Sequence, residues 1–187
     1  MRCTGQLFRR IPKPPVSVSL GRFAQAKGYQ VWRMKDYKTI FEKVESALIS
    51  AGSQNLSTYN FTWDESKACV GNTAYIIPTN DKWLLGLLNS QLIWRFYLNV
   101  SSTIRDGFVR FIAQYVEQLP IPAISDKQKA PIIECVQSIF AITKDEDYLE
   151  NPAKQAQVKA LEREIDQMVY QLYSLTEEEI RIVEGKG

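Results

Sequence analysis

The sequence contains no histidine among its 187 residues. This absence excludes imidazole as a general base or as a metal ligand. The three cysteines are odd in number, far apart and without the spacing of metal ligands: Cys3, Cys69 and Cys135. They predict neither a disulfide framework nor a zinc motif, and they fit a reducing cytoplasm. Any catalysis by this chain would have to use carboxylates, lysine, tyrosine or cysteine.

Long apolar runs are also absent. The most apolar stretch, residues 83–97, is too short for a membrane span. It is interrupted by four polar residues: Asn89, Ser90, Gln91 and Arg95. The N-terminus lacks an apolar segment followed by a small-residue cleavage site. We therefore expect a cytoplasmic protein without a membrane partner.

The composition is that of an ordinary globular protein, with 45% apolar and 24% charged residues. The charge is unevenly distributed. Residues 1–59 hold 10 Lys and Arg against 3 Asp and Glu, whereas residues 123–187 hold 8 against 13. This asymmetry indicates that any contact with a polyanion involves the first two thirds of the chain. The alternative is that the charges only keep the protein soluble.

The first third combines an extended arm with a predicted helix. Residues 1–22 are basic and rich in proline, which favours an extended arm. Apolar residues at helical spacing predict a helix over residues 37–51. Gly52 follows directly and is suited to end that helix.

The central third predicts a mixture of strands and one buried helix. Residues 61–63 alternate as in a strand, and residues 68–77 form a second strand that Pro78 closes. Thr79 or Asn80 is expected to cap one helix that runs to about Tyr97 and is apolar around most of its circumference. A short strand is expected over 108–112, and the compact part is expected to end at 119–122.

The last third has helical periodicity. Two apolar stripes predict helices at 126–142 and 157–173 that pack on the core or on each other. Two capping boxes mark helix starts. They pair Ser125 with Gln128 and Thr176 with Glu179.

These elements predict an α+β chain. We divide it into a basic N-terminal arm and helix at 1–55, a core at 56–124 and a C-terminal helical segment at 125–187. The core is expected to be an irregular mixed α/β fold around a buried central helix. The C-terminal segment is expected to form an antiparallel helix pair.

The segment between Asn99 and Tyr115 carries side chains suited to nucleic acid. Three consecutive hydroxyl residues, Ser101, Ser102 and Thr103, are able to donate hydrogen bonds to phosphates.

Three further side chains in the same segment are suited to reading bases. Arg105 and Arg110 are able to pair with a phosphate or with the edge of a guanine, and Gln114 is able to pair with adenine. The alternative is an ordinary loop with two solvated arginines.

A second chemistry is a metal-dependent nuclease. Glu65-Ser66-Lys67 has the acid-x-Lys pattern, with Asp36 or Asp64 as a further ligand. The carboxylates would hold Mg²⁺ and the lysine would assist attack of water on phosphate. The alternative is a charged turn between two strands. A third hypothesis is a helical assembly module, formed by 126–142 and 157–173, that does not bind DNA.

Two blocks of sequence resemble a known family. The first consists of Asn72–Pro78, Trp83–Ser90 and Gln114–Pro122, and the second of Ile165–Tyr173 and Leu175–Ile180. In this order they resemble the TaqI-like C-terminal specificity domain of adenine-specific DNA methyltransferases and type II restriction-modification enzymes. The resemblance extends from about Phe61 to Glu184, and residues 1–55 match poorly.

The resemblance implies a target-recognition domain of a bacterial or archaeal restriction-modification system. Such a domain docks in the major groove of double-stranded DNA. A methyltransferase or endonuclease domain, in cis or in trans, flips adenine and methylates its N6 with S-adenosylmethionine, and cleavage would need Mg²⁺. We therefore expect this chain to be the end of a longer enzyme.

The catalytic motifs of such enzymes are absent from this chain. It has no Gly-rich cofactor loop and no Asn/Asp-Pro-Pro-aromatic motif to hold a flipped base. Asn151-Pro152 supplies only the first two letters and lies in a polar connector. We expect no cofactor and name no catalytic residue, and the sequence leaves open whether the chain is itself an enzyme.

Overall fold

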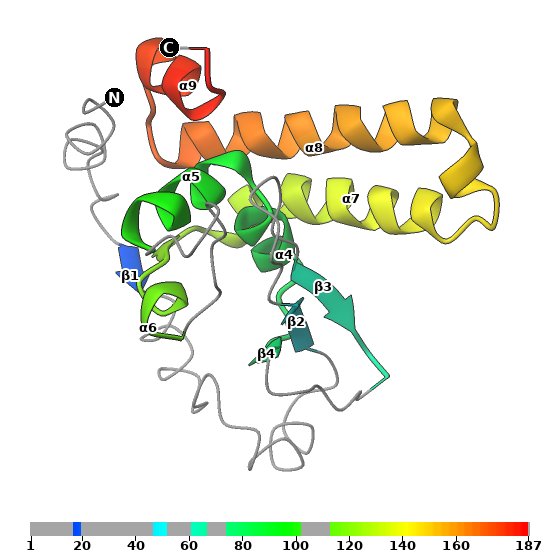
Figure 1. Cartoon of the computed structure of the whole chain (residues 1–187), viewed down its shortest axis with the longest axis horizontal. Helices are drawn as coiled ribbons and strands as arrows, with labels where there is room; N and C mark the ends of the chain where they lie inside the picture. Colours follow the sequence, from blue (N-terminus) through cyan, green and yellow to red (C-terminus); the bar gives the residue numbers. More distant parts are fainter. Residues whose placement is uncertain (1–16, 20–46, 52–60, 67–73, 102–112, 187) are drawn as a thin grey trace, which may run out of the picture.

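The computed structural model describes residues 17–19, 47–51, 61–66, 74–101 and 113–186, which are coloured in Figure 1. The expected strand at 108–112 lies outside these residues, as do most of the N-terminal arm and the first part of the helix expected at 37–51. Strands and helices are both present, so the α+β prediction is confirmed.

A three-stranded antiparallel sheet forms one side of the core, with strand order β3-β2-β4. Its central strand, β2 (Ala47–Ala51), pairs with β3 (Phe61–Asp64) and β4 (Ala74–Pro78). The prediction of a helix that continues to Ala51 is therefore wrong. The apolar spacing was helical, but backbone pairing on both sides and complete burial of Leu48 fix this segment as a strand.

The predicted central helix is two helices. Helix α4 (Trp83–Leu88) is buried along its whole length. The chain then turns at Asn89, and Ser90 adopts an extended conformation that starts α5 (Gln91–Val100). The Ser90 hydroxyl oxygen accepts from the Ile93 N–H at 3.5 Å. The start of α4 also differs from the prediction, because Thr79 accepts from the Asp81 N–H instead of capping the helix.

The C-terminal helix pair is confirmed (Figure 1). Helix α7 (Asp126–Thr143) and helix α8 (Pro152–Leu172) pack against each other, with the 3-10 helix η3 (Tyr148–Glu150) between them, and α9 (Glu177–Val183) follows. Both predicted capping boxes are present.

The Asn151-Pro152 pair is the N-terminal cap of α8. The Asn151 side-chain oxygen accepts from the N–H groups of Ala153 and Lys154, at 3.1 and 3.3 Å. Pro152 occupies the first helical position, where its missing N–H costs nothing. The pair therefore has a structural role, as its place in a connector indicated.

A second, smaller sheet joins two distant parts of the chain. Strand β1 (Ser17–Ser19) pairs antiparallel with β5 (Pro120–Pro122), so that Val18 lies opposite Ile121. A short helix, α6 (Ala113–Val116), precedes β5. The predicted end of the compact part at 119–122 thus contains a strand, and its central Ile121 and the preceding Leu119 are buried.

The core lies where α4 passes between the α7–α8 hairpin and the larger sheet (Figure 1). Gly86 allows α4 and α7 to approach closely. A Cβ at this position would lie 2.8 Å from Ile132 Cγ2 and 3.2 Å from Val136 Cγ2. None of the helices in the described part of the chain is long and apolar enough to cross a membrane.

Candidate functional site

Two of the six predicted contact residues are described by the structure. Ser101 ends α5 and its N–H donates to the Tyr97 carbonyl at 2.9 Å. Its hydroxyl is buried and has no hydrogen-bond partner among the described residues. Gln114 lies on α6 with its side chain exposed. The other four lie outside the described residues: Ser102, Thr103, Arg105 and Arg110.

The structure shows how the first end of this candidate segment, residues 101–114, is held. Helix α5 leads into it, and the N-terminus of α5 is bonded to α8. Asp166 accepts from the Gln91 N–H at 2.8 Å and from Gln91 Nε2 at 2.9 Å. Further along α5, Arg95 Nε donates to the Val183 carbonyl of α9 at 2.8 Å. Helix α5 is thereby fixed to α8 and to α9.

Burial raises the pKa of Asp166. Only 6% of its surface is exposed, and this desolvation raises the pKa of its carboxyl group. The two hydrogen bonds from Gln91 oppose that shift because they stabilise the charged form. Nearby Glu162 and Glu184 add to the increase.

The strand that follows the segment, β5, is bonded to Tyr173, the residue directly after α8. Helix α6 passes into β5 through a turn in which the Leu119 N–H donates to the Val116 carbonyl at 3.1 Å. The Tyr173 hydroxyl then donates to the Pro120 carbonyl at 2.6 Å. Tyr173 is buried, and burial raises the pKa of its phenol, so the hydroxyl remains a hydrogen-bond donor throughout the physiological pH range.

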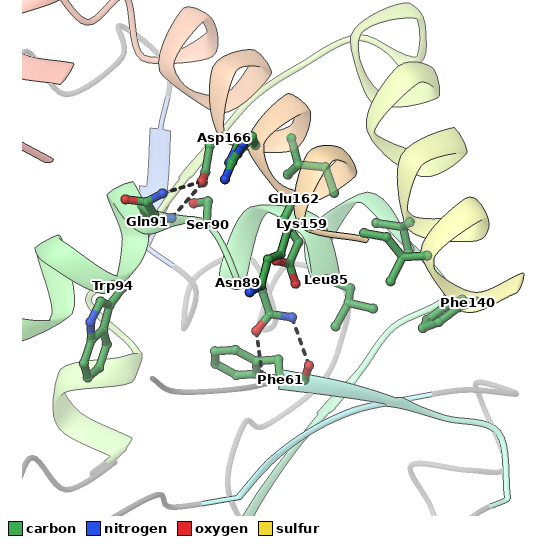
Figure 2. A pocket seen from close by; sticks show the side chains of 15 residues that line it. Phe61, Leu85, Asn89, Ser90, Gln91, Trp94, Phe140, Lys159, Glu162 and Asp166 are labelled. Atoms are coloured by element: carbon green, nitrogen blue, oxygen red, sulfur yellow. Dashed lines mark hydrogen bonds between the residues drawn. The ribbon is translucent and has the colours of Figure 1, made fainter. Parts of the chain in front are cut away.

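The turn between α4 and α5 joins three elements. The Asn89 side chain accepts from the Phe61 N–H at 2.8 Å and donates to the Phe61 carbonyl at 2.9 Å (Figure 2). This pairing extends the edge of β3 through a side chain. The Trp83–Ser90 block thus combines the tightly packed Gly86, the strand anchor Asn89 and the helix cap Ser90.

A cavity of about 500 Å³ opens beside this turn (Figure 2). Apolar and aromatic side chains line it, among them Phe61, Trp94 and Phe140. The charged residues of its wall are two bases and two acids: Lys159, Arg163, Glu162 and Asp166. Asn89 and Asp166 are already hydrogen-bonded within the protein. Asn89, Gln91 and Asp166 of this wall therefore serve as structural links between elements.

The two described residues of the acid-x-Lys pattern, Glu65 and Ser66, directly follow β3. Asp64 accepts from the Ser66 N–H at 3.2 Å, and Glu65 accepts from Trp63 Nε1 at 2.8 Å. Glu65 also pairs with Lys82 at 3.8 Å. Lys67 and Asp36 lie outside the described residues, within which no cluster of three potential metal ligands occurs.

The sequence did not identify Asp166 or the hydroxyl of Tyr173 as functional. Tyr173 ends the apolar stripe expected over 157–173 and directly follows α8, and the spacing of that stripe indicates only that Tyr173 faces inward. Asp166 follows Ile165 at the edge of that stripe, and a carboxylate beside buried positions was the available signal. Their partners lie far away in sequence, so the pattern gave no indication of what they bind.

Comparison with known proteins identifies the family of the chain. The TaqI-like C-terminal specificity domain matches residues 23–121, more than half of the chain. The chain belongs to this family. The match includes residues 23–55, which the resemblance left out, and it ends before the closing helical block.

Similar proteins include a curated methyltransferase and a restriction-modification enzyme of known structure. The Type II methyltransferase M.MjaIV of Methanocaldococcus jannaschii is 28% identical over 141 residues, which are 73% of this chain and 44% of that protein. A solved structure of the Type IIL restriction-modification enzyme MmeI in complex with DNA aligns with a TM-score of 0.56 at 20% identity. That alignment covers 74% of this chain and 20% of MmeI, and it establishes the shared fold.

Proposed function

We propose that this chain recognises a DNA target sequence as the C-terminal specificity part of a restriction-modification adenine methyltransferase or endonuclease. The observation that supports this most is the family match over residues 23–121. That match includes α4, α5 and the candidate segment between α5 and α6. Membership of this family and the geometry of Glu65 favour this function over a metal nuclease.

Recognition would combine contacts of two kinds. Hydroxyls and basic side chains of the candidate segment would bind phosphates and set the position on DNA, without reading sequence. Arg105, Arg110 and Gln114 would reach base edges in the major groove. Residues 123–187 carry a net negative charge, which DNA would repel. The contact would therefore involve the basic first two thirds of the chain.

Catalysis would belong to a partner methyltransferase or endonuclease domain, in cis or in trans. The chain spans less than half the length of the relatives that it matches. That partner would hold S-adenosylmethionine for methylation, and Mg²⁺ for cleavage. This chain would hold neither and would place the partner over the target adenine.

The first experiment measures binding to a random-sequence duplex by fluorescence anisotropy across a salt series. We expect the logarithm of the affinity to fall linearly with the logarithm of salt, with a slope of about −0.9 for each phosphate contacted. Selection from a random duplex library would then yield a preferred site. Negligible binding at low salt, or selection that yields no preferred site, would overturn the proposal.

A further inference from the structure

We propose that the cavity beside the α4–α5 turn is a docking groove for a protein segment in which an apolar side chain adjoins a carboxylate. This groove lies between β3, the α4–α5 turn and the α7–α8 hairpin. One side of it belongs to the matched residues 23–121, and the other side, formed by α7 and α8, lies beyond them. The inference adds a protein contact to the proposed recognition of DNA.

The groove is elongated and mostly apolar. Trp94 and Phe140 lie at opposite ends of its lining, with Phe61 and Leu85 between them (Figure 2). The hairpin contributes further aliphatic side chains: Val136, Ile139 and Ile165. Its volume of about 500 Å³ lies within the range of about 300–1,000 Å³ that is typical of ligand sites. An apolar side chain that enters the groove would leave water, which stabilises the complex.

Contacts within the protein hold both ends of the groove. Lys82 Nζ lies 5.5 Å from the centre of the Trp63 ring and 5.8 Å from the centre of the Phe140 ring. Lys82 thereby joins β3 to α7 through two cation–π contacts. At the other end, the Trp94 ring stacks on Tyr97 with ring centres 6.3 Å apart. Because these walls are already ordered, a partner would bind without the cost of ordering them.

Charges on one face of α8 select the occupant. Lys159, Glu162 and Arg163 line the groove at helical spacing. Loss of water contact raises the pKa of Glu162, and the charge of Lys159 opposes this rise, so these two side chains are neighbours. Asp166 accepts two hydrogen bonds from Gln91. Arg163 is exposed and has no ion pair with another described residue, so it is available to an incoming carboxylate.

The chemistry of the groove favours a protein segment over DNA. A phosphate backbone would meet the carboxylates of Glu162 and Asp166, and it has no apolar side chain to fill the groove. Addition of a strand at Phe61 is also disfavoured, because Asn89 already bonds the Phe61 N–H and carbonyl. We therefore expect an aromatic or aliphatic anchor in the groove and an acidic residue at Arg163. The proposed function already requires a partner protein domain.

The test begins with selection of binding peptides from a random library, with the whole chain as the target. We expect the selected peptides to share an aromatic or aliphatic residue beside Asp or Glu. Fluorescence anisotropy with one labelled peptide then measures affinity. Arg163→Glu should weaken binding at least about tenfold, because it places like charges together. The matched control is Arg181→Glu on α9, outside the groove, which should leave the affinity unchanged.

Two further variants separate docking from a folding defect. Arg163→Lys keeps the charge and should retain most of the affinity. Ile139→Ala removes part of the apolar wall from a half-buried position and should weaken binding by a smaller factor than Arg163→Glu. Melting temperatures of the Arg163 variants should match the wild type, since Arg163 is exposed. Wild-type affinity in both Arg163→Glu and Ile139→Ala, or selected peptides without acidic residues, would overturn the inference.

Two other occupants give different results. Displacement of the labelled peptide by a random-sequence duplex would assign the groove to DNA. Self-association that Arg163→Glu abolishes, measured by analytical ultracentrifugation, would assign it to a second copy of this chain. Either result would overturn the inference. Failure of the chain to bind any duplex would instead count against the proposed function and leave the docking groove standing.

Discussion

Asn89 and Phe61 are joined by two hydrogen bonds between the side chain of one residue and the backbone of the other. The Asn89 amide acts as a short strand edge for β3, just before Ser90 begins α5 (Figure 2). Only an amide supplies one donor and one acceptor in this arrangement. The turn between the two central helices is thereby tied to the sheet.

Replacement of Asn89 by alanine should lower the free energy of unfolding by about 1–3 kcal/mol, because each net hydrogen bond contributes about 0.5–1.5 kcal/mol. Urea unfolding monitored by circular dichroism would measure the change. Asn99→Ala, at an exposed position of α5, is the matched control and should change the value by less than about 0.5 kcal/mol. Equal effects of the two substitutions would contradict the assigned role of Asn89.

Gly86→Ala should destabilise the protein even though alanine favours helix formation. The helical gain is about 1 kcal/mol. The added methyl would lie 2.8 Å from Ile132 Cγ2, and overpacking of this kind costs about 1–3 kcal/mol. A double-mutant cycle with Ile132→Ala should show a clearly non-zero coupling energy. Additive effects would indicate that the two helices do not meet at Gly86.

Asp166→Asn should change how stability depends on pH. Burial raises the pKa of Asp166 above its value in the unfolded chain, so its ionisation opposes folding. The protonated Asp166 side chain therefore contributes its full share of stability below the unfolded pKa of about 3.9. This contribution is lost as pH rises through the higher pKa of the folded state. The asparagine variant should therefore gain stability relative to wild type across that window, since its side-chain oxygen still accepts from the Gln91 N–H. Urea unfolding from pH 4 to 8 would detect the divergence, and parallel curves would contradict it.

Arg110→Ala should distinguish a base contact from a phosphate contact. If Arg110 reads a base, its loss should cost about 1–3 kcal/mol on the selected duplex and relax the preference at one position. If it binds a phosphate, affinity should fall for all sequences and the salt slope should decrease by about one. Anisotropy on selected and scrambled duplexes would separate these results. Unchanged binding to both would remove Arg110 from the interface.

Local signals in the sequence predicted much of the fold. Both capping boxes, the strand at Phe61 and the two long C-terminal helices depend on residues close together in the chain. The helix expected to reach Ala51 shows the opposite case. The spacing around Leu48 suits a helix, but pairing with β3 and β4 makes the segment a central strand.

For the candidate site too, the sequence predicts some features and only the structure reveals others. The sequence alone identifies Arg105, Arg110 and Gln114 as candidate base-reading residues, because the hydrogen-bond donors and acceptors of a side chain are known without a structure. The bonds from Asp166 to Gln91 and from Tyr173 to Pro120, which hold the flanking elements α5 and β5, cross large separations in the chain. Periodicity reports which face of a helix is buried, and it gives no partner for a polar group on that face.

The sequence by itself determined the α+β class, the helical C-terminal third, the charge asymmetry and the resemblance to a specificity domain. These depend on composition, on short-range periodicity and on motifs. Only the tertiary structure decided that the apolar run divides into two helices at Asn89, that Asp166 holds the start of α5, and that Tyr173 holds Pro120 of β5. The physical reason is that buried polar groups must find hydrogen-bond partners, and those partners become neighbours only when the chain is folded.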